Sequence, residues 1–133
     1  MKYMLDTNIC IYLMKNKPKE VLERFKEHEI SDVCISAVTY AEMAYGIEKS
    51  KYADRNRVAV ALFLSGITVM DFDVQAATEY GRVRAELELK GTPIGKFDSM
   101  IAAHALSQNL TIVTNNTREF NRVEGLMVEN WVA

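Results

Sequence analysis

The chain has 133 residues, a length that suits one compact domain, so we expect a single domain over residues 1–133. Hydrophobic residues make up 49% and charged residues 26% of the sequence, an ordinary globular composition that should fold without disulfide staples. The net charge of −2 excludes a strongly basic nucleic-acid coat and a binder of anionic membranes. Any binding of RNA or DNA must therefore use a local patch.

Nothing in the sequence indicates export or a membrane anchor. The acid Asp6 comes too early for the apolar region of a signal peptide, and no apolar run is long enough to span a bilayer. Cys10 and Cys34 lack metal-ligand spacing and have apolar neighbours, so we interpret them as buried free thiols. We expect a cytoplasmic protein that does not associate with membranes.

The first elements are a buried strand and two helices. Residues 3–5 form a short apolar run that ends at Asp6, and the apolar spacing over residues 9–13 predicts a helix after it. Asp6 therefore lies at the carboxyl end of a strand. A second, more charged helix is predicted around residues 21–25.

A second strand and its helix come next. Residues 33–35 read as a buried strand, and Ser36 is a suitable N-cap for the helix that follows. On that helix Glu42 has apolar partners about one turn away, Val38 and Tyr45, so we expect Glu42 on the inward face.

The middle of the chain contains a third strand and a long helix. An apolar run over residues 58–64 precedes a strand predicted at residues 67–70. Asp73 is expected to cap a helix from about residue 74 to residue 90, which ends at the Gly-Thr-Pro of residues 91–93.

The last third alternates helix and strand again. A helix rich in small residues is predicted over 97–107, with Asp98 in its first turn, followed by strands at 110–113 and 126–128 that flank a helix start near 115–120. This alternation predicts an α/β fold: a mostly parallel five-stranded sheet, covered by helices on both faces as a three-layer sandwich. In such sheets, sites form at the carboxyl ends of the strands.

Four acids are expected near that edge: Asp6, Glu42, Asp98 and Glu119. Carboxylates that lie together repel one another unless a cation lies between them. Carboxylate oxygens are also the ligands that Mg²⁺ and Mn²⁺ prefer, and hydrolysis of a phosphodiester can use such ions. No Ser-His-Asp order, phosphate-binding Gly-rich loop or helical zinc-binding His pair offers an alternative chemistry.

Each acid also has a purely structural interpretation. Asp6 can cap the first helix, Glu42 can be a surface residue, and Asp98 can simply favour a helix start. Asn116 and Glu119 have the spacing of a capping box, so their role is open between cap and site.

The remaining polar candidates are a histidine and several bases. His104 lies six residues beyond Asp98, about 240° round an ideal helix, so we interpret it as a packed core histidine. Basic side chains that could contact phosphate, with a solvated surface as the alternative, are Lys15, Lys17, Lys96, Arg118, Arg122, Arg82 and Arg84.

Four segments in order resemble motifs of the PIN-domain toxins of the VapC type: residues 4–8 (MLDTN), 36–43 (SAVTYAEM) with Gly46, 93–98 (PIGKFD) with 101–105 (IAAHA), and 114–120 (TNNTREF). The resemblance spans nearly the whole chain. It implies an Mg²⁺- or Mn²⁺-dependent endoribonuclease, the toxin of a toxin–antitoxin pair, held inactive by a VapB-like antitoxin. It also implies a homodimer that forms a higher assembly with the antitoxin.

The resemblance also assigns residues. Asp6, Glu42 and Asp98 match the acids of the family, and where many relatives carry a fourth acid this chain has Asn116, with Glu119 nearby. Our hypothesis is that Asp6 and Asp98 bind the principal metal and Glu42 supports a ligand or orients the attacking water. One or two metals can bind, depending on the fourth position.

The ending Asn-Asn-Thr-Arg-Glu-Phe resembles toxins that cut initiator tRNA in the anticodon loop. Candidate RNA contacts are Thr7, Thr114, Asn115, Lys96 and Arg118, with Thr114 also a candidate for the polar shell of the metal.

Two rival functions are weaker. A phosphatase of the haloacid dehalogenase type also has an aspartate after its first strand, but it expects a second aspartate where this chain has Asn8. A catalytically silent PIN-like module would bind RNA or a partner without cleavage, and the intact acids argue against it.

Overall fold

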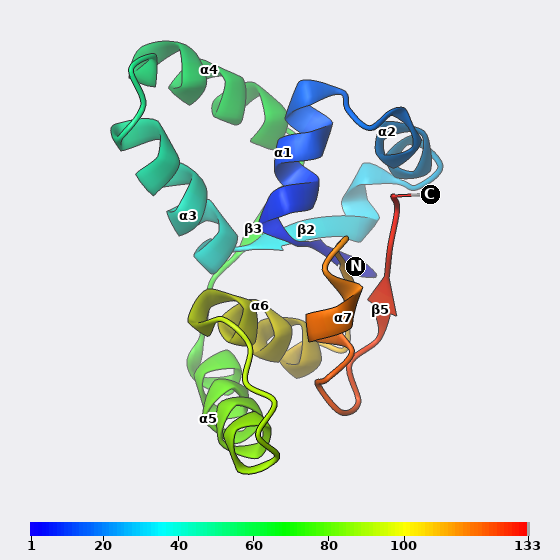
Figure 1. Cartoon of the computed structure of the whole chain (residues 1–133). Helices are drawn as coiled ribbons and strands as arrows, with labels where there is room; N and C mark the ends of the chain where they lie inside the picture. Colours follow the sequence, from blue (N-terminus) through cyan, green and yellow to red (C-terminus); the bar gives the residue numbers. More distant parts are fainter. Residues whose placement is uncertain (133) are drawn as a thin grey trace.

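A five-stranded sheet forms the centre of the computed structural model, which describes residues 1–132 (Figure 1). Its strands are β1 (Tyr3–Leu5), β2 (Val33–Ser36), β3 (Thr68–Met70), β4 (Thr111–Val113) and β5 (Val128–Glu129). They lie in the order β3-β2-β1-β4-β5, and each neighbouring pair is parallel.

Within residues 1–132 the chain forms seven α-helices and one short 3₁₀ helix at Ile30–Asp32. The α-helices are α1 (Thr7–Lys15), α2 (Lys19–Lys26), α3 (Ala37–Glu48), α4 (Ala53–Leu64), α5 (Val74–Leu89), α6 (Lys96–Ser107) and α7 (Thr117–Phe120). None of the helices in this part of the chain is long and apolar enough to cross a membrane.

Helices cover both faces of the sheet, as Figure 1 shows, with α1, α2 and α4 on one side and α5, α6 and α7 on the other. Side chains of a strand alternate between the faces, so Met4 packs with α5 and α6 while Leu5 packs with α1 and α2. Cys34 and Ile112 lie in register with Met4 and join the same core. Burial on both faces of the sheet explains the continuous apolar sequences of the central strands β1, β2 and β4.

The predicted α/β fold, with a parallel five-stranded sheet between two helical layers, is confirmed. Two elements differ from expectation. The apolar run at residues 58–64, to which no element was assigned, belongs to α4; consecutive apolar residues carry no period that separates helix from strand. The final strand covers Val128–Glu129 rather than 126–128, because it pairs at the sheet edge with Ile112 and Val113.

The starts of three helices position the site. Asp6 directly follows β1, Ser36 is the last residue of β2, and Asp73 follows the turn after β3. The side chain of each accepts a hydrogen bond from a backbone N–H of the helix that follows. Since β2, β1 and β4 are neighbours and parallel, Asp6, Ser36 and Thr114 emerge at one edge of the sheet.

Candidate active site

Asp6 is the most enclosed acid of the site, with 4% of its surface exposed. Its Oδ1 accepts a hydrogen bond from the backbone N–H of Thr7 at 2.7 Å, and its Oδ2 accepts one from the Thr114 hydroxyl at 2.7 Å. Burial raises the pKa of Asp6, the two hydrogen bonds oppose that rise, and the charge of Glu42 adds to it. Asp6 therefore caps α1 and is also held toward the edge of the sheet.

Glu42 on α3 is tied to the same turn. Its Oε1 accepts a hydrogen bond from the Thr7 hydroxyl at 2.7 Å, and that hydroxyl also lies 3.3 Å from the hydroxyl of Thr39. The inward face of α3 differs in part from the prediction, because Tyr45 is 66% exposed and the buried apolar side chains are Val38 and Met43. Glu42 lies at the margin of that face, half-buried.

Asp98 lies in the first turn of α6, as predicted, and is half-buried. Its pKa is raised to about 6, first by burial and then by the negative charges of Asp6, Glu119 and Glu42. The fold therefore brings three carboxylates within electrostatic range of Asp98 on α6: Asp6 from the end of β1, Glu42 from α3 and Glu119 from α7.

The residues at and near the position where many relatives carry a fourth acid, Asn116 and Glu119, belong to a small hydrogen-bonded segment after β4. The Asn116 backbone N–H donates to the Thr114 hydroxyl oxygen at 2.9 Å, and the Asn116 side-chain amide donates to Glu119 Oε2 at 3.0 Å. The capping-box alternative is wrong: the Asn116 side chain makes no cap hydrogen bond to α7, and Glu119 accepts from a side-chain amide instead of the backbone.

The candidate RNA contacts divide into two kinds. Lys96, Asn115 and Arg118 are exposed, and the Asn115 amide donates to the Tyr12 hydroxyl at 2.8 Å. Thr114 is fully buried and its hydroxyl donates to Asp6, and its role as an RNA contact stays a prediction. The Thr7 hydroxyl donates its hydrogen bond to Glu42, so its proton is not free for an RNA group.

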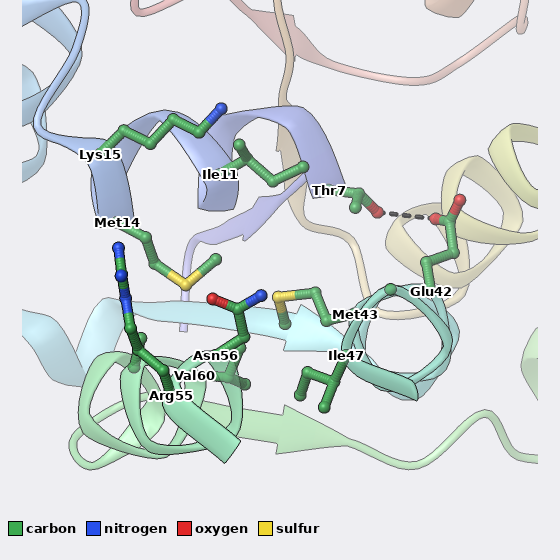
Figure 2. Close-up of a pocket in the computed structure, with 12 residues that line it drawn as sticks. Thr7, Ile11, Met14, Lys15, Glu42, Met43, Ile47, Arg55, Asn56 and Val60 are labelled. Atoms are coloured by element: carbon green, nitrogen blue, oxygen red, sulfur yellow. Dashed lines mark hydrogen bonds between the residues drawn. The ribbon is translucent and has the colours of Figure 1, made fainter. Parts of the chain in front are cut away.

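A groove that the sequence did not predict runs beside the site (Figure 2). It has a volume of about 460 Å³ and lies between α1, α3 and α4, with apolar walls that include Ile11, Met43 and Val60. Thr7 and Glu42 lie at one end, and Lys15 and Arg55 at the other. The signal that could have revealed it is Gly46, whose missing side chain leaves the wall of α3 open.

The four acids fit a hard divalent cation by their chemistry, although their side chains do not close around one. In residues 1–132, no three acidic, histidine or cysteine side chains stand in a geometry that would hold an ion. Burial first, and then repulsion from neighbouring acids, raise the pKa values of Asp6 and Asp98. A cation between the two carboxylates would oppose that repulsion and lower both pKa values.

Comparison with known proteins agrees with this fold. The family model of the PIN domain matches residues 3–126, and the chain belongs to the PIN-domain family. It is 54% identical to a protein of Shigella flexneri named tRNA(fMet)-specific endonuclease VapC, over 98% of both chains. A protein of the same name from Salmonella typhimurium is 50% identical over 98% of both chains. The predicted membership of the VapC-type PIN proteins is thus confirmed.

Solved structures give the same result. The structure of DNA-bound VapBC from Salmonella typhimurium contains a chain with a TM-score of 0.93, 50% identity and 98% coverage of both chains. VapBC2 from Rickettsia felis, bound to a promoter DNA fragment, gives a TM-score of 0.91 at 40% identity, covering 98% of this chain and 99% of that chain.

Proposed function

We propose that the chain is a metal-dependent endoribonuclease, the toxin of a VapBC-type toxin–antitoxin pair. It is a hydrolase that cleaves RNA phosphodiester bonds. The observation that carries this proposal is the convergence of Asp6, Glu42, Asp98 and Glu119, whose mutual repulsion contributes to the pKa of about 6 at Asp98. PIN-domain nucleases generally use divalent metals, and for this chain Mg²⁺ or Mn²⁺ suits the oxygen donors.

Asp6 and Asp98 are the principal metal ligands in this proposal. The Thr7 N–H and the Thr114 hydroxyl fix the rotation of the Asp6 carboxylate, and the start of α6 fixes Asp98. A metal ion bound there would lower the pKa of a water ligand and neutralise charge on the phosphate. The buried position of Asp6 excludes bulk water from one side of the centre.

Glu42 and Glu119 complete the centre from two sides. The Thr7 hydroxyl holds Glu42 where its carboxylate can support a ligand or orient the attacking water. At the fourth position Glu119 supplies the carboxylate and Asn116 orients it, since the Asn116 amide donates to Glu119 and the Glu119 charge acts on Asp98. A second metal ion would bind on the Glu119 side.

The substrate is proposed from the relatives. Two of them, 54% and 50% identical, are named tRNA(fMet)-specific endonucleases. We propose that this chain cuts initiator tRNA in the anticodon loop and acts in the cytoplasm, where that RNA is found. The exposed Lys96, Asn115 and Arg118 are on segments that border the acids, where they can contact the RNA backbone.

The proposed partner is a VapB-like antitoxin, since the similar solved structures are of VapBC assemblies. The groove between α1, α3 and α4 offers an apolar surface to a segment of such a partner, and it reaches the site at Thr7 and Glu42. A segment bound there would end beside the acids and obstruct RNA. The toxin itself is proposed to form a homodimer within the larger assembly.

The test is expression in bacterial cells that lack the antitoxin, with sequencing of RNA ends and growth as readouts. Wild type should stop growth and produce a dominant cut in the anticodon loop of initiator tRNA. Asp6→Asn keeps the size of the side chain but removes its charge, and it should do neither. Asp54→Asn, a change at an exposed acid of α4, is the matched control and should behave as wild type.

Cleavage at the wild-type level by Asp6→Asn would refute the assignment of the site. Folded wild-type protein that binds RNA but cleaves none at any Mg²⁺ or Mn²⁺ concentration would instead favour the silent PIN-like module.

A further inference from the structure

His104 lies in the interior behind the acidic site and takes no part in the proposed chemistry. It is on α6, six residues beyond Asp98, and none of its surface is exposed, which confirms the predicted core histidine. Its ring packs edge-on against Phe72, with centroids 5.3 Å apart and ring planes at 81°. Its Nδ1 lies 2.8 Å from the hydroxyl oxygen of Ser36.

Ser36 has a fixed role that determines the proton positions. It is the last residue of β2 and the N-cap of α3, and its hydroxyl oxygen accepts from the Val38 N–H at 3.0 Å. Among residues 1–132, His104 Nδ1 is the one hydrogen-bond acceptor placed for the Ser36 hydroxyl proton. Ser36 therefore donates to Nδ1, and the imidazole carries its proton on Nε2.

The other groups around His104 favour the neutral imidazole, and the hydrogen bond to Ser36 is its main polar contact. Burial lowers the pKa of His104, with the charge of Asp73 and the backbone of Asp71 opposing in part. Nε2 is buried and makes no hydrogen bond of good geometry. The contact with Ser36 is thus the well-formed hydrogen bond of this side chain.

This contact joins the two helices that carry acids. α3 carries Glu42 and Thr39, and α6 carries Asp98. In the described part of the chain, no other side-chain hydrogen bond connects α3, or its cap, to α6. Asp98 and Glu42 themselves repel each other electrostatically, so they cannot hold the helices together without a cation.

We propose that Ser36 and His104 are positioning residues, whose hydrogen bond sets the placement of α3 relative to α6 and thereby the spacing of the Glu42 and Asp98 carboxylates. The proposal rests on the proposed metal-dependent function of those acids. Groups that hold metal ligands in place typically change metal affinity by about 10–100-fold when removed, and this pair acts one step further from the ligands.

The experiment compares two substitutions that separate hydrogen bonding from packing. His104→Asn keeps an acceptor oxygen near the position of Nδ1 but leaves a void where the rest of the ring was. His104→Phe fills the space of the ring but offers Ser36 no acceptor. The readouts are the dissociation constant for Mn²⁺, measured by electron paramagnetic resonance without RNA, and the midpoint of thermal unfolding.

The expected order is opposite for the two readouts. His104→Asn should lower the thermal midpoint and bind Mn²⁺ within about twofold of wild type, whereas His104→Phe should bind Mn²⁺ about tenfold more weakly. Ser36→Ala should match His104→Phe in Mn²⁺ affinity. The double variant that carries both substitutions should bind Mn²⁺ no more weakly than the weaker-binding single variant. If His104→Phe does not fold, Ser36→Ala still tests the loss of the hydrogen bond between Ser36 and His104.

Wild-type Mn²⁺ affinity in His104→Phe or in Ser36→Ala would overturn the proposal, and so would a loss in His104→Asn equal to that in His104→Phe. Additive losses in the double variant would also overturn it. Failure of the proposed function is distinguishable, because neither wild type nor Asp6→Asn would then bind Mn²⁺.

Discussion

Replacing Asp98 with Asn should stabilise the metal-free protein at neutral pH while it abolishes RNA cleavage. The pKa of Asp98 is raised to about 6, from an ordinary value of 3.8, by burial and by the charges of Asp6, Glu119 and Glu42. The ionised form of Asp98 is therefore less favourable in the folded protein than in the unfolded chain. Asn has nearly the same shape and does not ionise, so it removes this cost.

The magnitude follows from the pKa. Each pKa unit corresponds to about 1.4 kcal/mol, which sets a ceiling of about 3 kcal/mol for the cost of ionised Asp98. Asp98 is only half-buried, so solvent screening reduces this to roughly 1–2 kcal/mol. The lost attraction between the acid and the start of α6, roughly 0.3–1 kcal/mol, acts in the opposite direction. We expect a net stabilisation of about 1 kcal/mol.

The sign depends on pH in a defined way. Well below pH 4, Asp98 is protonated in both folded and unfolded chains, so Asp98→Asn should have almost no effect on stability. As pH rises from about 4 to about 6, the unfolded chain releases the proton before the folded protein does, and the wild type loses stability. Above about pH 6 the advantage of the Asn variant should be constant.

Urea unfolding in EDTA between pH 4 and pH 8 measures this difference, with Asp54→Asn as a control at an exposed acid. Added Mg²⁺ should stabilise wild type and have little effect on Asp98→Asn, since ligands that bind only the folded state stabilise it. A destabilised Asp98→Asn variant with the same difference at pH 4 and pH 8 would refute the electrostatic reasoning.

Three further changes have expected outcomes. Thr114→Val removes the hydrogen bond to the Asp6 carboxylate and should lower kcat/KM about 10–100-fold, while Thr114→Ser should cleave nearly as wild type; equal activities would contradict the role of the hydroxyl. Glu119→Gln should weaken Mn²⁺ binding and, because it removes a negative charge that acts on Asp98, lower the pKa of Asp98 in NMR titration. If Asn116→Ala instead loses more Mn²⁺ affinity than Glu119→Gln does, Asn116 is the metal ligand. Gly46→Leu should fill the groove and weaken binding of a VapB-like antitoxin at least tenfold, measured by calorimetry. The free energy of unfolding should be maintained, because a Cβ added at Gly46 meets open space. Gly81→Leu on α5 is the matched control, and equal antitoxin binding by both variants would exclude the groove as the interface.

The sequence predicted the elements whose signals are local. The apolar runs predict the strands β1 and β2. The capping residues Asp6, Ser36 and Asp73 mark the starts of α1, α3 and α5, because each cap lies beside the helix that it begins. Asp98 could be placed in the first turn of α6 for the same reason. The gathering of the acids at one edge followed from strand alternation, which predicts a parallel sheet.

Features that depend on contacts across the fold could not be predicted in this way. The Thr7 hydroxyl meets Glu42 from 35 positions away, and Thr114 meets Asp6 across 108 positions, so no local pattern encodes either pair. The groove was missed because α4 had no periodic signal. His104 was placed in the core correctly, yet its bond to Ser36, 68 positions away, required the structure.

Crystals of the protein soaked in Mn²⁺ would show whether Asp6, Glu42 and Asp98 form one metal-binding centre, because the anomalous scattering of the ion locates it. We expect an Mn²⁺ peak that the carboxylate oxygens of Asp6 and Asp98 both coordinate at about 2.0–2.2 Å, with Glu42 coordinating the ion directly or through water. A peak elsewhere on the protein, or none at this site in crystals of active protein, would contradict this assignment.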